Sequence, residues 1–238
     1  MKENYLLDKK IKIYQPDEGY HASSDAVWLA AAIKKIKDGD KILDVGSGTG
    51  AVSLCLAERF QKQNPQIVGI EVQQCLAEAA TKSAIANRFD FVSFINADIF
   101  DTEIENGSFD HVITNPPYAL NDLQSPNESK AIAHNFQHED LSKWLDFCIK
   151  KIKPKGFFYI INRTEALENI VADISKKMGA IEVFLLYSKE GQKAKRVIIR
   201  AQKGSKAPLC VHYGIVVHNA DGSYSAKSEE VLRKGEYL

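Results

Sequence analysis

The sequence predicts an α/β protein with a doubly wound, mostly parallel sheet that ends in an antiparallel pair of strands. Short apolar runs of β character alternate with segments of helical spacing along most of the chain. Such alternation specifies a parallel sheet with helices on both faces. The last two apolar runs are separated by only about eight residues, too few for a helical crossover, so these two strands should pair antiparallel.

The expected elements follow in order along the chain. The expected strands are 41–45, 67–72, 91–96, 109–114, 157–162, 181–187 and 196–202, and the expected helices are 25–36, 52–60, 75–87, 141–152 and 166–178. Ser24 or Asp25 should cap the first helix. Pro154 and Gly156 should stop the fourth helix, and Gly179 should close the last.

Length and composition indicate one domain. The chain has 238 residues, 45% of them hydrophobic, enough for one substantial core. We expect an N-terminal segment 1–39, a ligand-binding core 40–206 and a C-terminal extension 207–238. No apolar run approaches the ~20 residues that span a bilayer, and the charged N-terminus lacks a secretory signal. Four cysteines without a CxxC pair favour reduced thiols in the cytoplasm.

The charges balance overall but are unevenly distributed. The chain carries 31 basic and 31 acidic side chains. Between Lys189 and Lys206, however, there are seven Lys or Arg and one Glu. This basic stretch could contact nucleic-acid phosphates. A solvated strand and loop would explain it equally well.

A glycine-rich loop follows the first expected strand of the alternating series. In the segment 43–50, Gly46, Gly48 and Gly50 allow a sharp turn and a close backbone approach to a ligand. The segment also fits a dinucleotide pattern if Ala51 replaces the third glycine, so NAD is an alternative. Asp44, just before the loop, favours an amine-bearing cation through charge-assisted hydrogen bonds and would repel a pyrophosphate.

Two further carboxylates follow the next strands. Glu71 lies 21 residues beyond Gly50, where it could accept both hydroxyls of a ribose. Asp98 follows the third strand, where it could accept from an adenine amino group. The ordered set of Asp44, Glu71 and Asp98 is typical of an S-adenosylmethionine site.

The tetrapeptide Asn115-Pro116-Pro117-Tyr118 ends the fourth strand. Proline stops the strand and fixes a stiff turn at its rim. An amine on a planar base is a poor nucleophile, because its lone pair is delocalised into the ring. The Asn115 side-chain oxygen and the Pro116 carbonyl could accept its two N–H bonds, while Tyr118 stacks on the flipped base. We therefore expect Asn115, Pro116 and Tyr118 to be catalytic through positioning and electrostatics.

These motifs resemble class I S-adenosylmethionine-dependent methyltransferases with an NPPY motif. More narrowly, the sequence is similar to the tRNA1(Val) adenine-N6 methyltransferase family. The similarity covers nearly the whole chain and is carried also by segments 19–30, 196–206 and 218–224. It implies a Rossmann-like seven-stranded sheet and methyl transfer to N6 of an adenine in tRNA, beside the anticodon of a valine tRNA.

The resemblance also implies roles for individual residues. Cofactor contacts are implied at Asp25, Asp44, Gly46, Gly48, Gly50, Glu71, Asp98 and Asn115. Contacts with tRNA phosphates are implied at Arg196, Arg200, Lys203 and Lys206. The expected protein is a cytoplasmic monomer that binds tRNA, with no metal and no membrane partner.

Other interpretations remain open. NPPY also suits a glutamine-amide methyltransferase acting on a release factor, or an rRNA guanine-N2 methyltransferase. A non-catalytic RNA-binding scaffold is a different class, and an NAD dehydrogenase lacks a second motif for hydride chemistry. His134 and His138 have helical spacing but no third ligand nearby, which disfavours a metal. Trp28 and Trp144 are expected in the core, and 121–130 as a loop near the substrate entrance.

Overall fold

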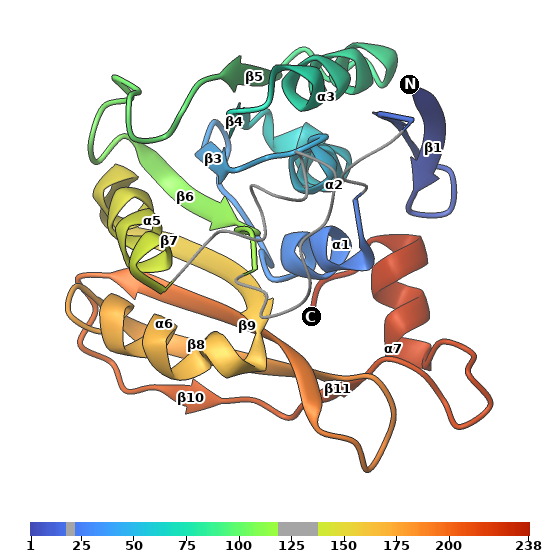
Figure 1. The fold of residues 1–238 in the computed structure, drawn as a ribbon, viewed down its shortest axis with the longest axis vertical. Helices are drawn as coiled ribbons and strands as arrows, with labels where there is room; N and C mark the ends of the chain where they lie inside the picture. The colour runs from blue at the N-terminus through green and yellow to red at the C-terminus, as the bar shows by residue number, and fades with distance from the viewer. Residues whose placement is uncertain (18–21, 119–137) are drawn as a thin grey trace.

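Within the part of the chain that the structure describes, a central sheet of nine strands organises the fold (Figure 1). The computed structural model describes residues 1–17, 22–118 and 138–238. The strand order is β10-β8-β9-β7-β6-β3-β4-β5, and β11 pairs with β8. The strands are β3 (Lys41–Val45), β4 (Gln66–Glu71), β5 (Val92–Asn96), β6 (Phe109–Thr114), β7 (Ile152–Arg163), β8 (Met178–Tyr187), β9 (Ala194–Lys203), β10 (Cys210–Val211) and β11 (Ile215–Val216).

The predicted fold class is confirmed by the pairing of these strands. β3 pairs parallel with β4 and β6, β4 with β5, and β6 with β7. β9 pairs antiparallel with both β7 and β8. All seven expected strands are present. The sheet is wider than the expected seven strands, because the two-residue strands β10 and β11 add to the outer edge of β8.

Helices cover both faces of the sheet (Figure 1). They are α1 (Ser24–Ala31), α2 (Ala51–Phe60), α3 (Gln74–Ala86), α5 (His138–Lys151), α6 (Leu167–Ile174) and α7 (Ala226–Glu229), with short helices η1 (Gln61–Gln63), η2 (Thr164–Ala166) and η3 (Glu230–Lys234). One core cluster includes buried residues of α1, α2 and α3, and a second includes those of α5 and α6. Within the described ranges, no helix is both long and apolar enough to span a bilayer.

Two expected helix boundaries were wrong. The side chain of Ser23, not Ser24 or Asp25, caps α1 by accepting from Asp25 N at 3.3 Å. The helix α6 ends at Ile174, and Gly179 lies inside β8 instead of closing the helix. A side chain at Gly179 would collide with the Ser205 backbone. This glycine therefore marks a close approach of two segments, which sequence alone does not distinguish from a helix end.

The end of α5 was predicted to within one residue, but the residues expected to stop it belong to a strand. The helix ends at Lys151, and Pro154 and Gly156 lie within β7. The β6–β7 register shifts between Phe109 and His111, which pair with Ile152 and Phe157. The extra residues of β7 form an irregularity at that point, where a proline need not donate to the ladder.

An N-terminal hairpin was missed by the sequence reasoning. It comprises β1 (Lys2–Leu6) and β2 (Ile11–Gln15) in a separate two-stranded sheet. Alternate residues of β2 are buried. Its backbone is bound to the α3 region, because Lys12 N donates to Asn87 Oδ1 and Tyr14 N to Ser83 Oγ, both at 2.9 Å. The hairpin thus extends the helical layer beside α3.

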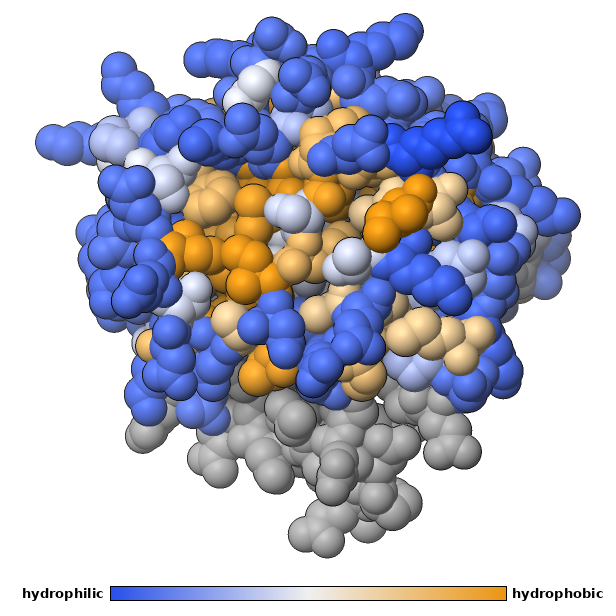
Figure 2. Space-filling view, turned by 90° about the horizontal axis from the view of Figure 1, so that it is seen from above, coloured by the Kyte–Doolittle hydropathy of each residue, from blue (hydrophilic) through white to orange (hydrophobic). Residues whose placement is uncertain are grey.

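The face over β5 and α3 gathers apolar side chains in a hollow ringed by polar ones (Figure 2). Large hydrophobic residues of this region are exposed, among them Val72, Ile85, Ile95 and Phe100. Two of them, Val72 and Phe100, also line the pocket described next. The apolar surface therefore continues into that pocket.

Candidate active site

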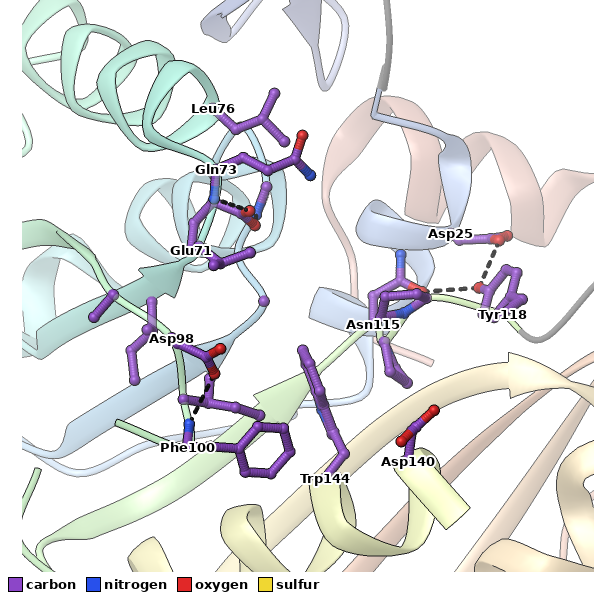
Figure 3. A pocket seen from close by; sticks show the side chains of 18 of the residues that line it. Asp25, Glu71, Gln73, Leu76, Asp98, Phe100, Asn115, Tyr118, Asp140 and Trp144 are labelled. Atoms are coloured by element: carbon purple, nitrogen blue, oxygen red, sulfur yellow. Dashed lines mark hydrogen bonds between the residues drawn. The ribbon is translucent and has the colours of Figure 1, made fainter. Parts of the chain in front are cut away.

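A cavity of about 380 Å³ lies at the carboxyl ends of the central parallel strands (Figure 3). Ligand pockets commonly have this size. Crevices at this edge of open α/β sheets are where ligands bind. Of the residues predicted for cofactor or substrate, those that line it are Asp25, Gly46, Gly48, Glu71, Asp98, Asn115, Pro116 and Tyr118.

The glycine loop forms one wall of the cavity. Gly46 and Gly48 have φ values of 70° and 54°, the left-handed region that glycine adopts without strain. Gly48 N donates to Glu71 Oε2 at 2.9 Å, which ties the loop to the end of β4. Gly50 does not line the cavity. It is the N-cap of α2, and a side chain there would collide with the Phe94 ring.

Asp44 lies beneath the loop and does not line the cavity. Its side chain is buried, and Oδ2 accepts from Ser53 N at 3.2 Å and from Ser53 Oγ at 2.7 Å. Burial raises the pKa of Asp44 to about 7. The expected direct contact with a ligand amine is therefore not provided by this conformation. The structure instead gives Asp44 the role of fixing the start of α2.

The loop holds polar atoms whose hydrogen bonds are unmet. Asp44 Oδ1, Ser47 Oγ and Thr49 Oγ1 are buried and have no hydrogen-bond partner among the described residues. Buried polar groups are normally satisfied. None of the three residues lines the cavity, so the fit to a ligand rests on the glycine cradle, where Gly46 and Gly48 let the backbone approach closely.

Glu71 and Asp98 lie on the side of the cavity opposite Asn115 and Tyr118 (Figure 3). Glu71 is buried, and Oε1 accepts from Gln73 N at 2.8 Å. Burial raises the pKa of Glu71, although its backbone hydrogen bonds lower it. Asp98 is exposed, and its Oδ1 accepts from Phe100 N at 2.9 Å. Both carboxylates are thus held by backbone N–H groups, which orients them at the cavity.

The tetrapeptide after β6 joins a hydrogen-bonded cluster with α1 (Figure 3). The Tyr118 hydroxyl lies 2.8 Å from Asn115 Oδ1 and 3.0 Å from Asp25 Oδ2. Arg196 Nε donates to the same Asp25 oxygen at 2.8 Å. Asp25, implied by resemblance as a cofactor contact, is thus bound to the proposed catalytic tyrosine.

Trp144 is a site residue that the sequence reasoning recognised only as a core residue. It packs against one core cluster as expected, but its side chain also lines the cavity from α5. Its Nε1 donates to Thr114 Oγ1 at 2.9 Å, and that hydroxyl donates to Val45 O at 2.8 Å. Asp140 lies one helical turn earlier and lines the same cavity. Asp140, a polar residue one turn from Trp144 on the same side of α5, was the sequence signal that this side of the helix borders a pocket. Trp28, by contrast, is buried as expected.

The four residues implied as phosphate contacts are not on one surface. Arg196 pairs with Asp25, and Arg200 forms an ion pair with Glu182. Lys203 Nζ donates to the carbonyls of Ile149 at 2.8 Å and Ile152 at 2.6 Å. Lys206 is exposed. Lys203 lies an odd number of residues from Arg196 and Arg200 on β9, so it points to the opposite face. The four side chains therefore do not share one face of the sheet, and the phosphate contacts implied for them stay a prediction.

Two other sequence features lie partly outside the described residues. The segment 121–130 and His134 fall in the range that the structure does not describe. Among the described residues, no group of three metal-ligating side chains is close enough to hold an ion. Cys55 and Cys148 are buried, and burial raises the pKa of both thiols.

The doubly wound sheet, the glycine loop and the NPPY cluster around one pocket define the class I methyltransferase fold. The chain belongs to a family described as "Methyltransferase domain", whose model matches residues 36–202. A solved structure described as a predicted O-methyltransferase from Agrobacterium tumefaciens has a TM-score of 0.74 at 23% identity, covering 90% of this chain and 98% of that one. A T. thermophilus 16S rRNA N2 methyltransferase in complex with AdoMet and guanosine has a TM-score of 0.57 at 18% identity, covering 85% and 50%.

Curated relatives are also similar to this chain over most of its length. A protein of Pedobacter heparinus is 26% identical over 99% of each chain. A protein of Actinobacillus pleuropneumoniae serotype 7 is 29% identical over 88% of this chain and 87% of that one. Both are named tRNA1(Val) (adenine(37)-N6)-methyltransferase.

Proposed function

We propose that this chain transfers a methyl group from S-adenosylmethionine to the N6 amine of an adenine in tRNA, beside the anticodon of a valine tRNA. The names of the two curated relatives support this substrate. The observation that carries the proposal is the meeting of Glu71, Asp98 and Asn115 at one cavity. We further propose that it acts as a monomer in the cytoplasm.

The cavity suits a cationic adenosine ligand. Four carboxylates, Asp25, Glu71, Asp98 and Asp140, line it. Asp25 is paired with Arg196, and the excess of acidic groups that remains gives an electrostatic field that favours a positive ligand. Glu71 would accept the ribose hydroxyls and Asp98 the adenine amino group, with Phe100 beside it. Gly46 and Gly48 allow the backbone to approach the ligand. When bound, S-adenosylmethionine supplies an electrophilic sulfonium methyl group.

The other end of the cavity would receive the target base. Asn115 Oδ1 and the Pro116 carbonyl would accept the two N–H bonds of the amine, which directs its lone pair into the cavity. Tyr118 would stack on the flipped base. The buried turn at Pro116 holds these groups rigidly, so little reorganisation is needed during transfer.

Methyl transfer from labelled cofactor to unmodified bulk tRNA, followed by nucleoside analysis, tests the proposal. We expect N6-methyladenosine as the product. We expect the Asn115→Ala variant to lose at least about a hundredfold in rate while retaining cofactor affinity, since removal of a single transition-state hydrogen-bonding group has costs of that order.

Other outcomes would identify the rival functions. Label in rRNA guanine or in protein glutamine, with none in tRNA, would overturn the substrate assignment within the same fold. No label in any acceptor, together with no cofactor binding by calorimetry, would favour a non-catalytic scaffold.

A further inference from the structure

Arg196 reaches the site from β9 and touches two of its residues. Its Nε lies 2.8 Å from Asp25 Oδ2, and its Cζ lies 5.0 Å from the centroid of the Tyr118 ring. The Asp25 and Arg196 side chains are 12% and 30% exposed. An ion pair this sheltered is screened less by salt than a surface pair. Arg196 is therefore engaged within the protein rather than extended towards solvent.

The Tyr118 hydroxyl has one proton and two nearby acceptors. Asn115 Oδ1 at 2.8 Å and Asp25 Oδ2 at 3.0 Å compete for it. In the proposed function, the Asn115 oxygen must also accept from the target amine. An amide oxygen has two lone pairs and can accept from both donors, but turning the hydroxyl proton to Asp25 leaves the Asn115 oxygen entirely to the amine. Asp25 provides the second acceptor, so the hydroxyl need not be left unsatisfied when substrate binds.

The guanidinium also restricts the Tyr118 ring. A guanidinium at this distance from a ring attracts it through a cation–π interaction. Arg196 covers one face of the ring, which leaves at most the other face for a base. The planar guanidinium serves the carboxylate and the ring together, a combination that the point charge of lysine does not reproduce.

From these contacts we infer that Arg196 is a positioning residue: acting through Asp25, it holds Tyr118 so that the hydroxyl can move from Asn115 to Asp25 as the target amine binds. This inference rests on the proposed function. It replaces the expectation that Arg196 contacts an RNA phosphate.

Substitution of Arg196 by lysine distinguishes a positioning role from a phosphate contact. In the full-length protein, we expect both Arg196→Lys and Arg196→Ala to lower kcat for tRNA methylation at least tenfold. KM for tRNA should stay within about twofold, and the salt dependence of tRNA binding should not change. Lys195→Ala, which removes one exposed charge from the same strand, should keep the wild-type kcat. A phosphate contact would give the opposite result, with Arg196→Lys close to wild type and Arg196→Ala losing about one unit of salt slope. That result would overturn the inference.

A second measurement uses no RNA. Urea unfolding of Arg196→Ala, Tyr118→Phe and the double variant should show non-additive effects. The change in the folding equilibrium constant of the double variant should differ at least twofold from the product of the changes in the two single variants. Additive effects would show that Arg196 does not hold the Tyr118 hydroxyl, whatever the acceptor, and would overturn the inference. Non-additive effects in a protein that transfers no methyl label to a tRNA adenine would support the coupling of Arg196 to Tyr118 and reject only the proposed function.

Discussion

The indole ring of Trp144 lies directly against Gly46. A Cβ atom built on Gly46 would lie 2.8 Å from Cζ2 and 2.9 Å from Cη2 of the ring. These distances leave no space for a side chain. The glycine loop and the helix α5 therefore meet at the wall of the cavity. We expect a substitution at either residue to alter ligand binding.

Gly46→Ala should weaken cofactor binding at least tenfold and lower the free energy of unfolding by about 1–2 kcal/mol. The left-handed φ of 70° strains any side chain by about that amount, and the methyl group must also displace the Trp144 ring. Gly39→Ala is the matched control, because Gly39 has φ 72° and no atom within 4 Å of the added Cβ. Calorimetry with S-adenosylmethionine should show a loss only for Gly46→Ala. Equal affinities in both variants would reject the role of the Gly46–Trp144 contact.

Thr114→Val should destabilise the protein by about 1–3 kcal/mol, because it removes the hydroxyl that links Trp144 to Val45 inside the protein. Thr114 is fully buried, and valine has nearly the same shape. Thr114→Ser keeps the hydroxyl and should retain the indole position. Cofactor titrations followed by tryptophan fluorescence compare the two. The same loss of affinity in both variants would mean that the hydroxyl does not orient the indole.

Asp44 should make stability depend on pH. Burial raises its pKa to about 7, above the ordinary value near 4 of the unfolded chain. Between these values the folded chain holds a proton that the unfolded chain has released, so the contribution of Asp44 to stability falls as pH rises through this window. Asp44→Asn removes this dependence.

Urea unfolding of wild type and Asp44→Asn at pH 5 and pH 8 provides the measurement. The stability of the wild type relative to the variant should fall by at least about 1 kcal/mol between the two pH values, since each unit of pKa shift corresponds to about 1.4 kcal/mol. A difference that does not vary with pH would show that Asp44 titrates normally.

Lys203→Met should lower the free energy of unfolding by about 1–2 kcal/mol, because the ammonium group satisfies two carbonyls where α5 ends and β7 begins. Lys206→Met should stay within about 0.5 kcal/mol of wild type, as expected for an exposed side chain. Thermal or urea unfolding distinguishes them. Equal stability of the two variants would show that the carbonyl contacts of Lys203 contribute nothing.

The central fold was predictable because its strands are short, apolar and regularly spaced between helices. The polar residues at or just beyond the ends of β4, β5 and β6 could be placed at one cavity for the same reason: parallel strands end at a common edge. Asn115 and Glu71 therefore lie where the sequence indicated.

The remaining site features depend on tertiary contacts. Whether Trp144 faces a core or a cavity depends on the neighbour that approaches it, here a glycine. The hairpin β1–β2 depends on Asn87 and Ser83, about 70 residues away, which no local pattern reveals. The division of Arg196 and Lys203 between two faces of β9, in contrast, follows from strand alternation and could have been predicted.

The thin strap formed by β10 and β11 has a consequence for the behaviour of the protein in concentrated solution. β8 is ten residues long and largely apolar, and a bare edge of this kind would recruit strands from other copies. His212 N donates to Val183 O at 2.9 Å and Val217 N to Tyr187 O at 2.8 Å, so the strap occupies that edge with the chain's own backbone. Because β10 and β11 are each only two residues long, they offer few backbone groups with which strands of other copies could pair. Removal of residues 207–217 should therefore favour aggregation more than loss of the fold.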